Sequence, residues 1–224
     1  MLSTLYSAAC QGVDGYPVAV ECSAFRRMPG FELVGLPDAA VKEAKERVRS
    51  ACQNSGIPFP QLEILVNLAP ANLKKEGSGF DLAILLAILR CDNKIPLSLP
   101  TENLCFVGEL SLSGEVRPVN GVLCLALAAR DAGKTEIYVP EKNAAEAAVV
   151  DGITVYGVHD VNQLLRHLSG KERIAPTTYD IAEFNARNGR SDVDFSDVRG
   201  QAVAKRALEI AAAGGHNVLL IGPP

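Results

Sequence analysis

The sequence lacks several features that would place it in a simple functional class. Its six cysteines include no Cys-x-x-Cys pair, so they do not have the spacing of a zinc site. No apolar run approaches the roughly 18 to 20 residues that cross a bilayer, and no charged segment followed by an apolar signal core opens the chain. The formal net charge of -4 gives no global footprint for nucleic acid. We therefore expect a protein of the reducing cytoplasm with no metal site and no membrane contact, in which any DNA contact comes from a local patch or from beyond Pro224.

The composition that remains is that of a globular chain. Hydrophobic residues make up 48% and charged residues 21%, which excludes a disordered chain. Predicted strands and helices alternate up to about Gly170, which indicates an α/β domain over residues 1–170. A polar, irregular linker is expected over 171–193, with a short helix near 181–187, and a second domain begins at 194–224.

The stretch 62–90 is expected to form the centre of the first domain. Apolar residues alternate with polar ones from Leu62 to Leu68, which predicts a strand with one face in the core. Nearly every residue from Phe80 to Leu89 is apolar, so this helix has no polar face and should run through the middle of the domain. Ser78 is its predicted N-cap, with Asp81 completing a capping box.

Shorter patterns predict the elements on either side. Asn120 is expected to cap a helix that Gly133 closes, and Asp160 to cap a helix that runs to Leu168. Further strands are expected at 4–10, 16–24, 31–34, 104–110, 136–139 and 153–156, and a helix at 143–150. A helix that begins near Pro37 should bury the stripe Val41, Ala44, Val48 and Ala51.

Two runs in this domain resemble a known family. VGLPDAAVKEAKERVRSA (34–51) and NLAPANLKKEGSGFDLAI (67–84) are similar to the N-terminal domain of magnesium-chelatase-like AAA+ ATPases of the YifB/ComM family, which resembles the proteolytic domain of Lon. The resemblance implies an α/β, Lon-protease-like fold. Lon-type proteases place a nucleophilic serine at the start of the corresponding helix and activate it with a lysine on a later helix.

The matched positions in this sequence hold neither group. Alignment on the run 75–78 puts the nucleophile at Gly79, and alignment on 114–118 puts the lysine at Leu123. Nucleophilic catalysis needs a hydroxyl and a base within hydrogen-bond reach. The resemblance therefore implies a protease fold without catalytic residues, although a shift of one position in the alignment would bring Ser78 to the nucleophile site.

Several polar residues allow two interpretations. Lys74 and Lys75 belong to a solvated loop or contact DNA or a phosphate. The basic residues on the helix after Pro37 form a solvated face or a DNA-facing strip that Glu43 and Glu46 interrupt. The histidines His159 and His167 have no cluster of possible ligands nearby, so structural or surface roles are expected.

The last part of the chain has a pattern of its own. A helix is predicted over 202–213, closed by Gly214 and Gly215, and a short strand over 217–221. Gly222, Pro223 and Pro224 follow, where a phosphate-binding loop of the form GxxxxGK[ST] would begin. The runs DVRGQ and KRALEIAAAGGHN resemble the opening of the AAA+ module of the same family, so a truncated P-loop AAA+ module is expected here.

This resemblance implies an ATP-driven motor in the full-length protein. ATP and Mg²⁺ would be its cofactors and a homo-hexamer its assembly, and it would act on DNA as a helicase or branch-migration factor in recombination or natural transformation. Gly222, Pro223 and Pro224 are the ATP-binding candidates, and Val198, Arg199 and Gly200 the adenine-pocket candidates. A metal-insertion motor and a non-catalytic interaction or oligomerisation module are the alternatives.

Residues 1–224 alone are expected to hydrolyse no ATP. The loop lysine, the magnesium ligand and the acidic residue that P-loop hydrolysis requires are not among them. The measurement is magnesium-dependent ATP turnover by purified 1–224. Turnover that co-purifies with the folded protein would contradict this expectation.

Overall fold

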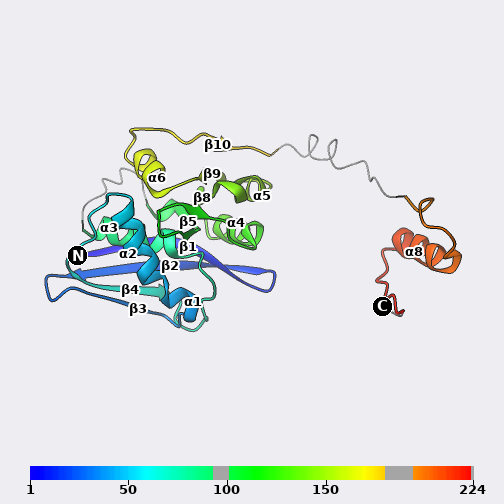
Figure 1. Cartoon of the computed structure of the whole chain (residues 1–224), viewed down its shortest axis with the longest axis horizontal. Helices are drawn as coiled ribbons and strands as arrows, with labels where there is room; N and C mark the ends of the chain where they lie inside the picture. The colour runs from blue at the N-terminus through cyan, green and yellow to red at the C-terminus, as the bar shows by residue number, and fades with distance from the viewer. Residues whose placement is uncertain (93–100, 180–193, 223–224) are drawn as a thin grey trace. The chain divides into compact units, whose positions relative to one another are not determined.

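The computed structural model describes residues 1–92, 101–179 and 194–222. The chain divides into two compact units, Met1–Tyr179 and Asp180–Pro224 (Figure 1). In the parts of the chain so described, no helix has both the length and the apolar character needed to cross a membrane.

The first sheet of the larger unit is built on a long hairpin. In spatial order its strands are β1 (Leu2–Gln11), β2 (Asp14–Phe25), β4 (Glu63–Ala69) and β3 (Gly30–Val34). The β1–β2 and β2–β4 pairs are antiparallel, and β3 runs parallel to β4. Ile64, Val66 and Leu68 of β4 are buried while their neighbours are partly exposed, which confirms the predicted alternation.

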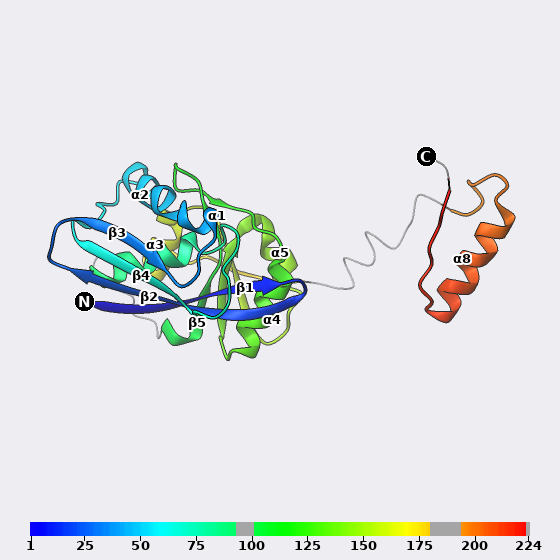
Figure 2. The ribbon, with the colours of Figure 1, turned by 90° about the horizontal axis from the view of Figure 1, so that it is seen from below.

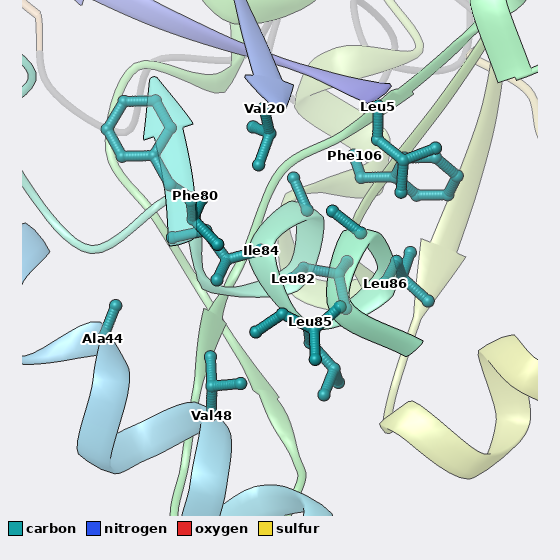
Figure 3. Packing of buried hydrophobic residues seen from close by; sticks show 14 of the residues in the cluster. Leu5, Val20, Ala44, Val48, Phe80, Leu82, Ile84, Leu85, Leu86 and Phe106 are labelled. Atoms are coloured by element: carbon teal, nitrogen blue, oxygen red, sulfur yellow. The ribbon is translucent and has the colours of Figure 1, made fainter. Parts of the chain in front are cut away.

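Three helices follow in this half of the unit: α1 (Ala39–Lys42), α2 (Ala44–Asn54) and α3 (Asp81–Cys91). Ten of the 11 residues of α3 are buried, so the prediction of a helix through the middle of the domain is confirmed. Figure 3 shows the α3 side chains between Leu5 and Val20 of the hairpin and Ala44 and Val48 of α2. The predicted apolar stripe on α1 and α2 is buried throughout.

The second sheet contains shorter strands. In spatial order they are β10 (Pro176–Thr177), β9 (Thr154–Val158), β8 (Glu136–Pro140) and β5 (Leu104–Phe106), with β5, β8 and β9 parallel. The strands β6 (Glu109–Leu110) and β7 (Val116–Arg117) pair with each other as a two-stranded ribbon. The helices of this half are α4 (Val122–Asp131), α5 (Ala144–Ala147) and α6 (Val161–Leu168). Helix α4 packs on β1 and β2 (Figure 2).

Caps and breaks in this half follow the predictions only in part. Asp160 caps α6 by accepting the Gln163 N–H at 2.8 Å, as predicted. The cap predicted at Asn120 is wrong, because α4 begins after Gly121 in the left-handed region and makes no side-chain cap bond. The strand predicted over 104–110 is divided into β5 and β6, because the Gly108 carbonyl accepts the Leu82 N–H of α3 and the Gly108 N–H donates to the Gly79 carbonyl.

The start of α3 also differs from the predicted capping box. The Ser78 hydroxyl donates to the Glu109 carboxylate and does not accept a hydrogen bond from a helix N–H. The Asp81 carboxylate is turned into the core, where it accepts from Arg47 Nε at 2.6 Å, Arg47 Nη2 at 3.0 Å and the Leu110 N–H at 3.1 Å. Burial raises the pKa of the Asp81 carboxyl, and the Arg47 guanidinium opposes that shift by binding its ionised form.

The end of the larger unit extends past the predicted boundary. Strand β10, Pro176–Thr177, pairs with β9 inside the range expected to be a linker. The short helix predicted near 181–187 lies outside the described residues.

The described part of the smaller unit contains one helix, α8 (Ala202–Gly214), which ends at the left-handed Gly215 as predicted. The strand predicted over 217–221 is wrong, because these residues are not paired with any described strand. Their side chains are exposed, with Leu219 at 82% and Ile221 at 89%. An apolar strand is stabilised by neighbouring strands that bury its faces, and 194–222 contains no such neighbour.

We predict that Arg47→Met lowers the free energy of unfolding by about 3 kcal/mol, because it leaves the Asp81 carboxylate buried without its cation. The measurement is urea denaturation at pH 7. In the variant, the guanidinium that opposes the effect of burial is gone, so the pKa of Asp81 is raised further, and the deficit should shrink as the pH falls below that raised pKa and the carboxyl becomes neutral.

Arg49→Met is the matched control for this prediction, since Arg49 lies on the same helix but is exposed. It should cost no more than about 1 kcal/mol, mainly the contact of its guanidinium with the Phe59 ring. Equal losses for the two variants would show that the Arg47–Asp81 pair does not support the helix.

Candidate functional site

A hollow of about 500 Å³ lies at the N-terminal end of α3. Its walls come from the end of β1, the loop 76–80, Glu109 of β6 and the segment 118–120 before α4. The residue matched to the Lon nucleophile, Gly79, and its neighbour Ser78 both line it. We refer to this space as the α3 hollow.

Gly79 occupies a position that has room for a side chain. Its carbonyl accepts the Gly108 N–H at 2.9 Å, and the Gly108 carbonyl accepts the Leu82 N–H at 3.1 Å. A Cβ atom at Gly79 would lie 3.8 Å from Val107 Cγ1 and 3.9 Å from Val119 Cγ1, which is ordinary contact distance. The position lacks a hydroxyl although a serine would fit there.

The remaining groups of the hollow do not form a nucleophile and base. The Ser78 hydroxyl donates to Glu109, whose other oxygen lies 3.6 Å from Arg117 Nη1. Leu123, matched to the Lon lysine, is 38% exposed on the first turn of α4, and none of the described residues that line the hollow is a lysine, arginine or histidine. The arrangement can hold a polar ligand, but it offers no basic amine to activate a hydroxyl.

The two loop lysines before the hollow have opposite environments. Lys74 is exposed and lies 2.7 Å from the Glu76 carboxylate. Lys75 is fully buried, and its ammonium donates to the Pro70 carbonyl and, at 2.8 Å, to the Leu73 carbonyl. Burial lowers the pKa of Lys75. The expectation of a solvated loop is therefore wrong for Lys75, whose ammonium fastens the loop, and a DNA contact stays a prediction that only Lys74 could make without rearrangement.

The nucleotide candidates lie in the smaller unit, before and after α8. Val198, Arg199 and Gly200 are exposed and precede the helix. The Lys205 ammonium of α8 donates a hydrogen bond to the Val198 carbonyl. Gly222 is exposed, with nothing within 4 Å of where its Cβ would be. Pro223 and Pro224 lie outside the described residues.

The three histidines occupy structural or surface positions. The His216 ring lies where a side chain at Gly214 would be. The backbone N–H of His216 donates to the Ala211 carbonyl at 2.9 Å, so this residue shapes the turn after α8. His159 is exposed and lies 3.4 Å from Glu141. The His167 ring packs among aromatic residues of the second sheet.

Two residues that organise the hollow were not identified from the sequence. Arg47 follows Ala44 by three positions and precedes Ala51 by four, so it lies on the buried face of α2, and that spacing could have revealed it. No pattern in the sequence indicates a role for Glu109, because only the fold brings its partners Ser78 and Arg117 next to it.

Comparison with known proteins shows what the larger unit is similar to. Lon protease 2 of Thermus thermophilus is 27% identical over 165 residues, covering 68% of this chain and 20% of its own. The larger unit is therefore a Lon-like α/β domain.

Two family models match the chain. One, described as "Subunit ChlI of Mg-chelatase", matches residues 20–143, and the other, "Magnesium chelatase, subunit ChlI", matches residues 194–224. Competence protein ComM of Haemophilus influenzae is 42% identical over 225 residues, covering 100% of this chain and 44% of its own. YifB of Escherichia coli is 40% identical over 226 residues, covering 100% and 43%.

The chain belongs to the magnesium-chelatase-like ComM/YifB family, with a Lon-like N-terminal region followed by the start of an AAA+ module. It spans less than half the length of the curated relatives it matches.

We predict that Gly79→Ala changes the free energy of unfolding by less than about 1 kcal/mol, because Gly79 has ordinary backbone angles and its Cβ would meet no close atom. The matched control is Gly35→Ala. Gly35 has φ +100°, and a Cβ there would lie 2.8 Å from Leu68 N and closer still to Leu68 O, so a loss of at least about 2 kcal/mol is expected.

Urea denaturation of both glycine variants measures this difference. A large loss for Gly79→Ala would mean that the hollow has no space for a nucleophile and that the match to the Lon serine position is spurious.

Proposed function

We propose that this chain is the N-terminal part of an ATP-driven AAA+ motor that acts on DNA, as a helicase or branch-migration factor in recombination or natural transformation. Residues 1–179 would be its accessory domain, without protease activity. The absence of protease activity is supported by the α3 hollow, which has space for a side chain at Gly79 but is lined by no lysine, arginine or histidine among the described residues. The observation that carries the motor proposal is the match of residues 194–224 to the magnesium chelatase model. The name of the Haemophilus influenzae relative, a competence protein, supports the uptake or recombination of DNA as the process.

The motor function rests on residues 194–224, which match the magnesium chelatase model. ATP and Mg²⁺ would be bound by the complete module, in which Gly222, Pro223 and Pro224 open the phosphate loop. Val198, Arg199 and Gly200 would contribute to the adenine pocket, and a ring of six identical subunits, as in the family that the chain resembles, would be the working assembly.

A metal-insertion motor is the second candidate, because both matching family models are described by a magnesium chelatase subunit. The two candidates require different substrates. A nucleic-acid motor is stimulated by DNA, whereas a chelatase motor is stimulated by a porphyrin and its metal.

The test uses a chain that carries the complete ATPase module. We predict that forked or single-stranded DNA raises its ATP turnover several-fold and that a porphyrin with Mg²⁺ does not. Replacing the phosphate-loop lysine with alanine should abolish turnover with and without DNA. Turnover that ignores DNA and rises with porphyrin would favour the metal-insertion motor.

The same assay examines the accessory domain. Lys74→Glu should reduce the DNA stimulation if the loop 70–77 contacts DNA, and Lys142→Glu, at another exposed lysine of the same domain, is the matched control. Equal stimulation in both variants and in the parent chain would remove Lys74 from the proposed DNA contact.

A further inference from the structure

The larger unit ends over a cluster of stacked rings. Tyr138 of β8 and Tyr156 of β9 have ring centroids 5.0 Å apart, and the His167 ring of α6 lies 5.0 Å from Tyr156 and 5.6 Å from Tyr138. Figure 1 shows α6, β9 and β10 together at this side of the domain. After α6 the chain passes back over these rings before it pairs with β9 as β10.

Hydrogen bonds define which nitrogen of His167 carries the proton. The Ile174 N–H donates to His167 Nδ1 at 2.9 Å, so Nδ1 has a free electron pair. His167 Nε2 lies 3.2 Å from the Tyr138 hydroxyl, which donates in turn to Glu136 Oε2 at 2.8 Å. A neutral ring with its proton on Nε2 satisfies every one of these bonds.

A protonated ring cannot keep this arrangement. The second proton would be on Nδ1 and would face the Ile174 N–H, so two donors would oppose each other at hydrogen-bond distance. One of them must move away. His167 is held by its ring contacts and its helix, whereas Ile174 lies in a segment without helix or strand structure.

We infer that His167 is a pH-operated latch, whose protonation releases residues 173–175 from the ring cluster. The segment before them stays attached, because the N–H groups of Lys171 and Glu172 donate to the Arg166 carbonyl. The segment after Ile174 is attached to β9 through the two-residue strand Pro176–Thr177. Release would therefore free the segment between α6 and β10 while β10 stays paired with β9.

The surroundings of His167 place its protonation below neutral pH. Burial is the main cause that lowers the pKa of His167, the nearby Arg173 lowers it further, and Glu136 opposes both. Tyr138 and Tyr156 stay neutral because burial raises the pKa of each phenol, and Arg166 on the same helix is paired with Glu172. The latch is closed at neutral pH, and it opens as the pH falls below the ordinary histidine value of about 6.5.

The experiment is hydrogen exchange of the backbone amides in residues 171–179, measured by mass spectrometry at pH 7.5 and 5.5 and corrected for the intrinsic exchange rate. In the parent chain, we expect the protection of Ile174 to fall at least tenfold between pH 7.5 and 5.5. The ring protons of His167, followed by NMR over the same range, should titrate together with this loss of protection.

Two variants at position 167 separate the latch from general acid destabilisation. His167→Asn keeps an acceptor near the place of Nδ1 but does not titrate, so the segment should stay protected at both pH values. His167→Phe keeps an aromatic ring but has no acceptor, so the segment should be open at both. His159→Asn, at an exposed histidine, is the matched control and should behave like the parent chain.

The protection of α3 amides reports whether each variant is folded. The inference is overturned if His167→Asn loses protection at pH 5.5 as the parent does. It is equally overturned if His167 does not titrate above pH 5.5, or if it titrates while Ile174 stays protected.

Discussion

The larger unit depends on one buried ion pair at the start of a helix that has no polar face. Because α3 is apolar all round, it must begin inside the core, where the Asp81 carboxylate cannot reach water. Arg47 of α2 supplies the countercharge, and the Leu110 N–H of β6 supplies a further donor. One carboxylate thereby joins α2, α3 and β6, and it fixes the positions of the loop 76–80 and of Glu109 around the hollow.

This construction explains how the domain keeps the form of a catalytic site without the catalytic groups. The backbone bonds that link Gly79, Gly108 and Leu82 hold the start of α3 and the end of β5 together, and none of them involves the side chain at position 79 or 123. A serine and a lysine at those positions would add chemistry but no support to the fold. The architecture of this domain is therefore compatible with either residue set.

The sequence was sufficient to predict the elements that depend on local periodicity. The alternation in β4 and the apolar run of α3 follow directly from which residues must leave water. The caps at Ser78 and Asn120 were mispredicted because a hydroxyl or amide before a helix has several possible partners, and Ser78 found a distant carboxylate. The burial of Lys75 depends on loop carbonyls that turn inward, which no spacing reveals. The strand over 217–221 depends on neighbours that residues 194–222 do not contain.

The attachment of the loop 70–77 has a consequence for how the domain responds to salt. Lys75 binds neutral carbonyl oxygens in a buried site, so mobile ions do not reach the contact and do not screen it. The neighbouring pair of Lys74 and Glu76 is exposed and weakens as the ionic strength rises. In concentrated salt the surface of this loop therefore loses its ion pair while its backbone keeps its path, and the wall that it gives to the hollow is unchanged.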